Sequence, residues 1–254
     1  MAEAIAEPGE ELARTLPAPW APVLAAATPI EIPARRTVVV VPHPDDEVLL
    51  SGGLIARQLR RRVPVVVVAV TAGEAAYPGL AQGPLAAQRR GEQVRALQAL
   101  GATSRSPFRL RRLEIPDGMV AAHEGGLADE LAALVGPDDL LVAPWIHDWH
   151  PDHEACGRAA VAAAAHRHPL CWGGLFWAYH RVDPTAHRQL ALVSLALDAT
   201  ELRRRNDAVA AHRSQWDRHV GTVGTVGTAG TGPVLTPDLL DLLQTPVEHY
   251  VVAS

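Results

Sequence analysis

Lysine is absent from the 254-residue sequence, and all 23 basic residues are arginine. Without lysine, the chain has no side-chain amine for Schiff-base catalysis and no P-loop lysine for nucleotide phosphates. Cysteine is scarce as well. The two cysteines, Cys156 and Cys171, fit neither a disulfide framework nor a CxxC metal site, so we interpret them as structural thiols.

Long apolar segments are also missing. No stretch approaches 18 consecutive apolar residues, so the sequence predicts no transmembrane helix. The first thirty residues contain four glutamates and several prolines, which is the wrong chemistry for a secretory signal, and we therefore expect a cytoplasmic protein. The formal net charge of −5 argues against a nucleic-acid binder, because such proteins need a basic face to release counterions.

Short apolar segments alternate with helical patterns along most of the chain. The hydrophobic fraction of 48% is ample for a sizeable core. We predict strands at 37–41, 64–70, 109–115, 139–144 and 247–252, and helices near 48–62, 85–100, 125–135, 153–166 and 199–216. Several of these strands are apolar throughout, as in parallel strands buried on both faces. The alternation predicts an α/β protein with a Rossmann-like, open, mostly parallel sheet and helices on both of its faces.

Two segments fall outside this alternation. Residues 1–35 are rich in Pro and Ala without a clear period, and we interpret them as an N-terminal arm that lies on the domain or on a partner. Residues 36–254 would then form a single domain, and assembly into a homo-oligomer stays open. The stretch at 220–232 repeats Gly and Thr, which predicts a flexible loop that either covers the site or has no role in it.

A cluster of titratable residues follows the first predicted strand. In "PHPDDE" (42–47), His43, Asp45 and Asp46 stand between that strand and a helix, at the sheet edge where open α/β folds bind ligands. Helix capping explains one aspartate, but not a second beside a histidine. His43 and Asp46 can surround one metal ion, which leaves Asp45 to face its open side. Imidazole nitrogen with carboxylate oxygen suits Zn²⁺, with Fe²⁺ or Mn²⁺ as alternatives.

Two ligands are too few for a stable metal site, and a second cluster offers candidates for a third. The stretch "HDWHPDH" (147–153) follows the strand predicted at 139–144 and precedes a helix. Its titratable residues include His147, His150, Asp152 and His153. Three histidines in seven positions at a strand end are more typical of a functional site than of surface or core residues.

The two clusters together carry a specific resemblance. "PHPDDE", followed about a hundred residues later by "HPDH", resembles the zinc-dependent PIG-L/LmbE-like de-N-acetylases, which act mainly on N-acetylglucosamine conjugates. Further matching segments are "TAGE" (71–74), "RRGEQVRALQALG" (89–101), "PDGM" (116–119) and "RNDAVAAHRSQW" (205–216). The resemblance covers roughly residues 37–216.

The resemblance implies roles for the residues of both clusters. Three residues would be the zinc ligands: His43, Asp46 and His153. Asp45 would be the general base. His150 would stabilise the developing oxyanion or protonate the leaving amine, and Asp152 would orient His150.

The resemblance also implies contacts with the substrate. It places Asp117 and one of two arginines, Arg89 or Arg90, near sugar hydroxyls, and we add Glu47 to the substrate-binding set. Four tryptophans lie in or near the second cluster: Trp145, Trp149, Trp172 and Trp177. Aromatic faces suit sugar rings or an apolar aglycone, although tryptophans near a sheet end more often belong to the core.

These features predict a zinc-dependent hydrolase with one metal ion per chain. It would remove the acetyl or acyl group from the amide nitrogen of an N-acyl amino-sugar conjugate, with a metal-bound water as nucleophile. The expected partner is a soluble small molecule of N-acetylglucosamine type, from secondary metabolism. Two alternatives stay open: a metal-dependent phosphoesterase, whose site often holds two metal ions, and a catalytically silent sugar-binding protein.

Overall fold

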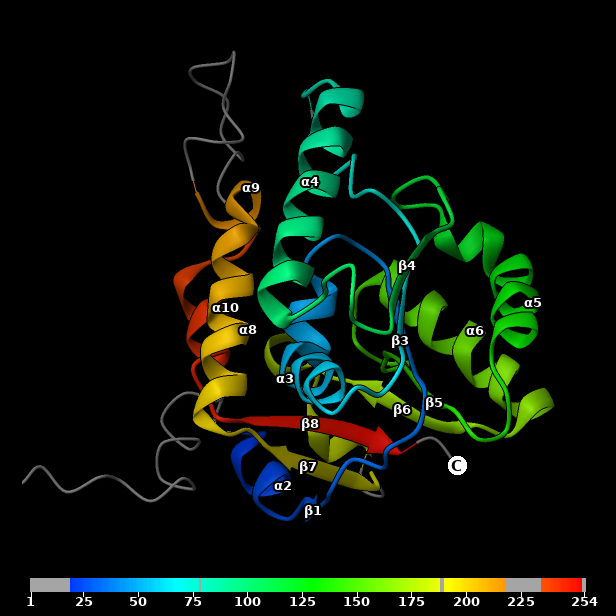
Figure 1. Ribbon diagram of the computed structural model, residues 1–254, viewed down its shortest axis with the longest axis vertical. Coiled ribbons are helices and arrows are strands. Elements are labelled where there is room, and N and C mark those ends of the chain that lie inside the picture. The colour runs from blue at the N-terminus through cyan, green and yellow to red at the C-terminus, as the bar shows by residue number, and fades with distance from the viewer. Residues whose placement is uncertain (1–18, 78, 188–189, 218–233, 253–254) are drawn as a thin grey trace, which may run out of the picture.

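The computed structural model describes residues 19–77, 79–187, 190–217 and 234–252 (Figure 1). In this part of the chain, eight strands form one sheet in the order β1-β7-β8-β6-β5-β2-β3-β4. The strands are β1 (Thr28–Pro29), β2 (Thr37–Val41), β3 (Val65–Ala69), β4 (Phe108–Arg112), β5 (Leu140–Pro144), β6 (Leu170–Gly174), β7 (Leu192–Ala196) and β8 (Val247–Val252). Neighbouring strands are parallel except where β8 pairs with β6 and β7. The predicted α/β fold with a mostly parallel sheet is confirmed.

Valine runs form the centre of the sheet. β2 and β3 have the sequences TVVVV and VVVVA, and every residue in them is buried. Valine is stiff at χ1 and packs well on a pleated surface, which favours a strand over a helix. Parallel strands that are buried on both faces need helices on each side of the sheet.

Two helix layers cover the sheet (Figure 1). The helices on one face are α3 (Asp46–Arg60), α4 (Gln82–Leu100) and α8 (Ala199–Ala211). The helices on the other face are α5 (Glu124–Leu134) and α6 (Pro151–Arg167). The shorter elements are α2 (Ala21–Ala25), α7 (Ala178–Arg181), α9 (Arg213–Trp216), α10 (Pro237–Leu242) and the 3-10 turns η1 (Val120–His123) and η2 (Pro184–His187). Odd-numbered residues of β2, such as Val39, face the first layer, and Val38 and Val40 face the second.

Some predicted elements differ from the structure. The helix predicted at 199–216 is two helices, because His212 leaves the helical backbone (φ −86°, ψ 54°) and contacts the buried Glu47. The strand predicted at 109–115 ends at Arg112. β6 and β7 were not predicted; both are five residues long, and β6 ends in two glycines. The loop predicted at 220–232 lies outside the described residues, and no described helix is long and apolar enough to cross a bilayer.

Part of the segment interpreted as an N-terminal arm packs on the domain. β1 adds a parallel strand to the sheet edge at β7. Trp20 is fully buried, and its indole Nε1 donates to the carbonyl oxygens of Ala178 and Val182 at 3.1 and 3.0 Å. Ala178 is the first residue of α7 and Val182 directly follows its last residue, so Trp20 holds the segment against the helix that follows β6. The domain boundary near residue 35 stays a prediction.

We expect Trp20→Ala to lower the free energy of unfolding by about 3–5 kcal/mol, because it removes a large buried side chain and leaves a cavity. Denaturant unfolding followed by circular dichroism measures this change. The exposed Thr28→Ala on β1 is the control, with an expected effect within about 0.5 kcal/mol. Similar small effects in both variants would show that the segment adds nothing to the stability of the domain.

Candidate metal centre and active site

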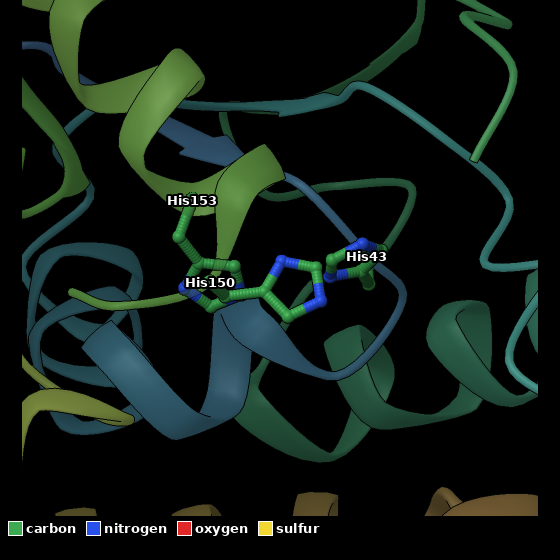
Figure 2. Close-up of side chains that lie close together, drawn as sticks. All are labelled: His43, His150 and His153. Atoms are coloured by element: carbon green, nitrogen blue, oxygen red, sulfur yellow. The ribbon is translucent and has the colours of Figure 1, made fainter. Parts of the chain in front are cut away.

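The two titratable clusters meet at one edge of the sheet. β2 and β5 are parallel neighbours, with Val38 opposite Leu141 and Val39 opposite Val142. The loop from β2 to α3 and the loop from β5 to α6 therefore emerge side by side at the carboxyl ends of the strands. Figure 2 shows His43 from the first loop close to His150 at the end of the second loop and to His153 in the first turn of α6.

The three predicted metal ligands lie close together, and an oxygen of Asp46 stands between the two histidines. Oδ2 of Asp46 is 3.3 Å from Nδ1 of His43 and 3.3 Å from Nε2 of His153. One nitrogen each from His43, His150 and His153 also lies within 4.8 Å of the other two. This donor set, imidazole nitrogen with carboxylate oxygen, is the kind that divalent transition metals prefer.

The hydrogen bond at Nδ1 of His153 orients the ring so that Nε2 can bind a metal. The ring is fully buried, and its Nδ1 lies 2.8 Å from Oδ2 of Asp148. When Nδ1 carries the ring proton and donates it to this carboxylate, the lone pair of Nε2 faces Asp46. Nε2 itself has no hydrogen-bond partner. A carboxylate on the outer nitrogen is the usual support of a metal-binding histidine. Such an orphaned, buried acceptor fits a metal ion.

His43 is held in the same way. Its Nε2 lies 3.1 Å from Oδ1 of Asp117 and 3.3 Å from Oδ2 of Asp152. Nδ1 is therefore the nitrogen that is left for the shared centre beside Asp46. Although burial opposes it, these three carboxylates raise the pKa of His43 well above its ordinary value. The pocket around the ring thus favours a cation.

Asp45 lies beside the three predicted metal ligands. It is almost fully buried, lines the pocket, and has the unusual backbone angle φ 137°. Its Oδ2 is 3.6 Å from the guanidinium of Arg89. Burial raises the pKa of Asp45 to about 7, and the charge of Asp46 adds to this effect while Arg89 opposes it. In contrast, His153 and His43 outweigh burial and lower the pKa of Asp46.

His150 occupies the open side of the site. Its ring centre is 4.9 Å from that of His43 and 5.1 Å from that of His153. Burial, and then the charges of His43 and His153, lower the pKa of His150 to about 4. Its Nδ1 accepts a hydrogen bond from the backbone N–H of Asp152 at 3.3 Å. The neutral ring therefore carries its proton on Nε2.

The prediction that the Asp152 carboxylate orients His150 is wrong in its geometry. This carboxylate contacts His43 instead and accepts hydrogen bonds from the backbone N–H groups of Gly118 and Val120 at 2.8 and 3.2 Å. The reason is its place in the first turn of α6, from which the side chain points toward η1. Only the backbone of Asp152 contacts His150.

The predicted substrate-binding residues have different environments. Glu47 is fully buried behind the site, where it contacts His212 at 3.0 Å and accepts from Gln93, so its assignment to the substrate is wrong. It follows Asp46 at the start of α3 and points toward α4 and α9 instead of the pocket. Asp117 lines the pocket but is engaged with His43.

The choice between the two arginines is decided by position. Arg89 is buried, lines the pocket, and donates to the carbonyl oxygens of Gly73 and Pro44 at 2.7 and 3.1 Å. Its guanidinium thus fixes the loops around Asp45. Arg90 pairs with Glu114 at the surface and does not line the pocket.

The pocket has a volume of about 360 Å³ and an aromatic wall. Trp149 and Trp177 line it, whereas Trp145 and Trp172 are buried in the core. Sequence reasoning missed Asp148, although it lies within the "HDWHPDH" stretch. It also gave no role to His212, whose segment was noted only as part of the resemblance.

Comparison with known proteins identifies the family of this chain. The sequence profile of the family described as GlcNAc-PI de-N-acetylase (PIG-L) matches residues 38–164, half of the chain. The matched region includes every residue of both clusters. The chain therefore belongs to the PIG-L family.

Individual relatives have related names. The chain is 31% identical over 136 residues to the probable N-acetyl-alpha-D-glucosaminyl L-malate deacetylase 2 of Bacillus subtilis (strain 168), a match that covers 51% of this chain and 60% of that protein. Among solved structures, the conserved protein TT1542 from Thermus thermophilus is 27% identical, with a TM-score of 0.54 over 72% of this chain and 80% of that one. The zinc-inhibited form of teicoplanin deacetylase Orf2, 23% identical with a TM-score of 0.56 over 71% and 84%, shares the fold.

We expect Asp148→Asn to weaken metal binding by about 10- to 100-fold. The amide NH₂ group would face Nδ1 of His153 and favour the tautomer that carries its proton on Nε2, where the metal binds. Competition with a chromophoric chelator measures the affinity for Co²⁺ or Zn²⁺. The exposed Asp138→Asn is the matched control and should bind as the wild type does. Unchanged affinity in Asp148→Asn would exclude this supporting role.

Proposed function

We propose that this protein is a metal-dependent hydrolase that removes the acetyl group from the nitrogen of an N-acetylglucosamine-type conjugate, with Zn²⁺ as the first candidate metal. The observation that carries the proposal is the arrangement of His43, Asp46 and His153 around one point, with Asp45 and His150 on its open side. The names of the relatives support it, because the B. subtilis protein is a probable deacetylase of a glucosaminyl malate. The chain matches about 60% of that relative's length.

A metal ion held by His43, Asp46 and His153 would polarise the acyl oxygen and lower the pKa of a water molecule toward about 7. Asp45 has the position of the general base, because it lines the pocket next to the centre while its carboxylate contacts neither histidine ligand. A pKa of about 7 matches a group that must both accept and return a proton. Arg89 holds this carboxylate in place through the loops on both sides.

His150 supports the same reaction as a hydrogen-bond donor. Since its Nδ1 accepts from the backbone of Asp152, its Nε2–H is free to donate to the oxygen on which negative charge develops. The pKa of His150, lowered to about 4, keeps the ring neutral. The proton that the leaving amine requires would then come from Asp45, which received it from water.

We expect Asp45→Asn and Asp46→Asn to separate catalysis from metal binding. Asp45→Asn should retain the metal and lose turnover by about 10²- to 10⁴-fold, because it removes the base and keeps the ligands. Asp46→Asn should lower the metal content itself, because it removes the shared carboxylate. Release of free amine from N-acetylglucosamine conjugates and elemental analysis measure the two properties.

The exposed Asp129→Asn serves as the control for these variants. Equal loss of metal in Asp45→Asn and Asp46→Asn would mean that the two neighbouring carboxylates are misassigned. The assay should compare Zn²⁺, Fe²⁺ and Mn²⁺ at one equivalent, since Orf2 is known in a zinc-inhibited form.

The same elemental analysis addresses the phosphoesterase alternative. In the described residues, both groups of side chains that could hold a metal include His43. One ion per chain is therefore expected, whereas many metal phosphoesterases hold two. A sugar-binding protein without activity would have no use for a buried aspartate beside the metal.

A further inference from the structure

Trp149 combines a strained backbone conformation with an exposed side chain. Its φ is +70°, a region that bulky residues rarely occupy because the backbone is strained there. Burial does not offset this strain, because half of the side chain, 50%, remains exposed. Glycine or asparagine would suit this backbone better. An exposed indole on strained backbone at a pocket rim points to a ligand.

The neighbours of Trp149 form a continuous wall that begins at the active site. The ring of Trp177 is stacked with that of His150, at 6.4 Å between centres. The ring of Trp149 is a further 6.4 Å from Trp177, and the guanidinium carbon of Arg181 lies 4.7 Å above the Trp149 ring. A ligand whose acetamido group reaches His150 would thus extend along two indoles toward a cation.

Arg181 has unused capacity for binding. It is exposed, and in the described part of the chain its guanidinium forms no ion pair with a carboxylate. Stacking on an aromatic ring leaves its N–H donors in the plane of the guanidinium, where they suit the two oxygens of a carboxylate. Arg181 is not itself a lining residue of the pocket, but it contacts Trp149, which is one. This end of the wall therefore complements a negative charge, in contrast to the acidic centre around Asp46.

The apolar part of the pocket lining favours a ring over a polyol. Leu49, Val234 and Leu235 also line it. The hydroxyl groups of a polyol placed against such a surface would lose their bound water without gaining new hydrogen-bond partners. An aromatic ring would instead bury apolar area and meet the indoles at offset or edge-to-face angles.

We propose that Trp149, Trp177 and Arg181 form an aglycone subsite that selects amino-sugar conjugates whose aglycone is an aromatic ring bearing a carboxylate. The inference rests on the proposed function for the placement of the amino sugar near His150. It adds the chemical class of the group attached to that sugar.

Binding of deacetylated glycosides tests the subsite without any turnover. Isothermal titration calorimetry would compare 4-carboxyphenyl, phenyl and methyl glucosaminide on the metal-loaded protein. The wild type should bind the carboxyphenyl compound most tightly and the methyl compound most weakly. Arg181→Gln should reduce affinity for the carboxyphenyl compound by about tenfold and remove its advantage over the phenyl compound. Arg105→Gln, an exposed arginine remote from the pocket lining, is the control.

Trp149→Asn provides a second readout. It should weaken both aryl compounds several-fold more than the methyl compound, while the melting temperature stays level or rises because asparagine tolerates positive φ. A fall of several degrees would make Trp149 a structural residue and overturn the proposal. Equal affinity of the three glycosides for the wild type would overturn it as well.

The matching N-acetyl glycosides separate this inference from the proposed function. Hydrolysis of all three with equal kcat/KM, together with equal binding of the deacetylated compounds, would keep the deacetylase and reject the subsite. The opposite result is also possible: the wild type prefers the carboxyphenyl compound in binding, Arg181→Gln loses this preference, and no acetate is released from any of the three N-acetyl glycosides. This result would keep the subsite and reject the deacetylase.

Discussion

β2 and β5 lie next to each other in the sheet although about a hundred residues separate them in the chain, and their parallel pairing sets the distance between the loops that follow them. Each loop alone offers an incomplete set of ligands. Every residue of both strands is buried, TVVVV in β2 and LLVAP in β5, so packing on both faces of the sheet holds the pair in place. The stability of the sheet centre therefore also fixes the geometry of the site.

Around this centre, carboxylates fix the histidines, and backbone amides fix the carboxylates. Asp148 accepts from the N–H groups of Phe176 and Ala178 while it holds His153, so one side chain connects a proposed metal ligand to the segment that carries Trp177. Behind Asp45, Glu47 accepts from the Asp45 backbone N–H at 3.3 Å and contacts His212. A buried network of this kind is stabilising only when its members are satisfied together.

The sequence allowed β2, β5, the two clusters that follow them and the family to be predicted, because these follow from local patterns. The directions of individual side chains could not be predicted, since Asp46 and Glu47 are neighbours in the chain yet point to opposite sides of a helix end. For the same reason, the contacts of Asp152 with His43 and of Asp148 with His153 were not predicted. Which imidazole a carboxylate contacts depends on η1 and α7, which lie far away in sequence. The helix predicted at 199–216 is interrupted at His212 because of a tertiary contact, which helix propensity cannot predict.

The position of β8 has a consequence for the order of folding. This strand lies between β6 and β7 and is antiparallel to both, yet it follows every other strand in the chain. During synthesis, which proceeds from the N-terminus, the β1–β7 pair has no neighbour to join until β8 has left the ribosome. Two open sheet edges, at β6 and β7, are exposed until then. Completion of the sheet is thus a late event in the synthesis of the chain.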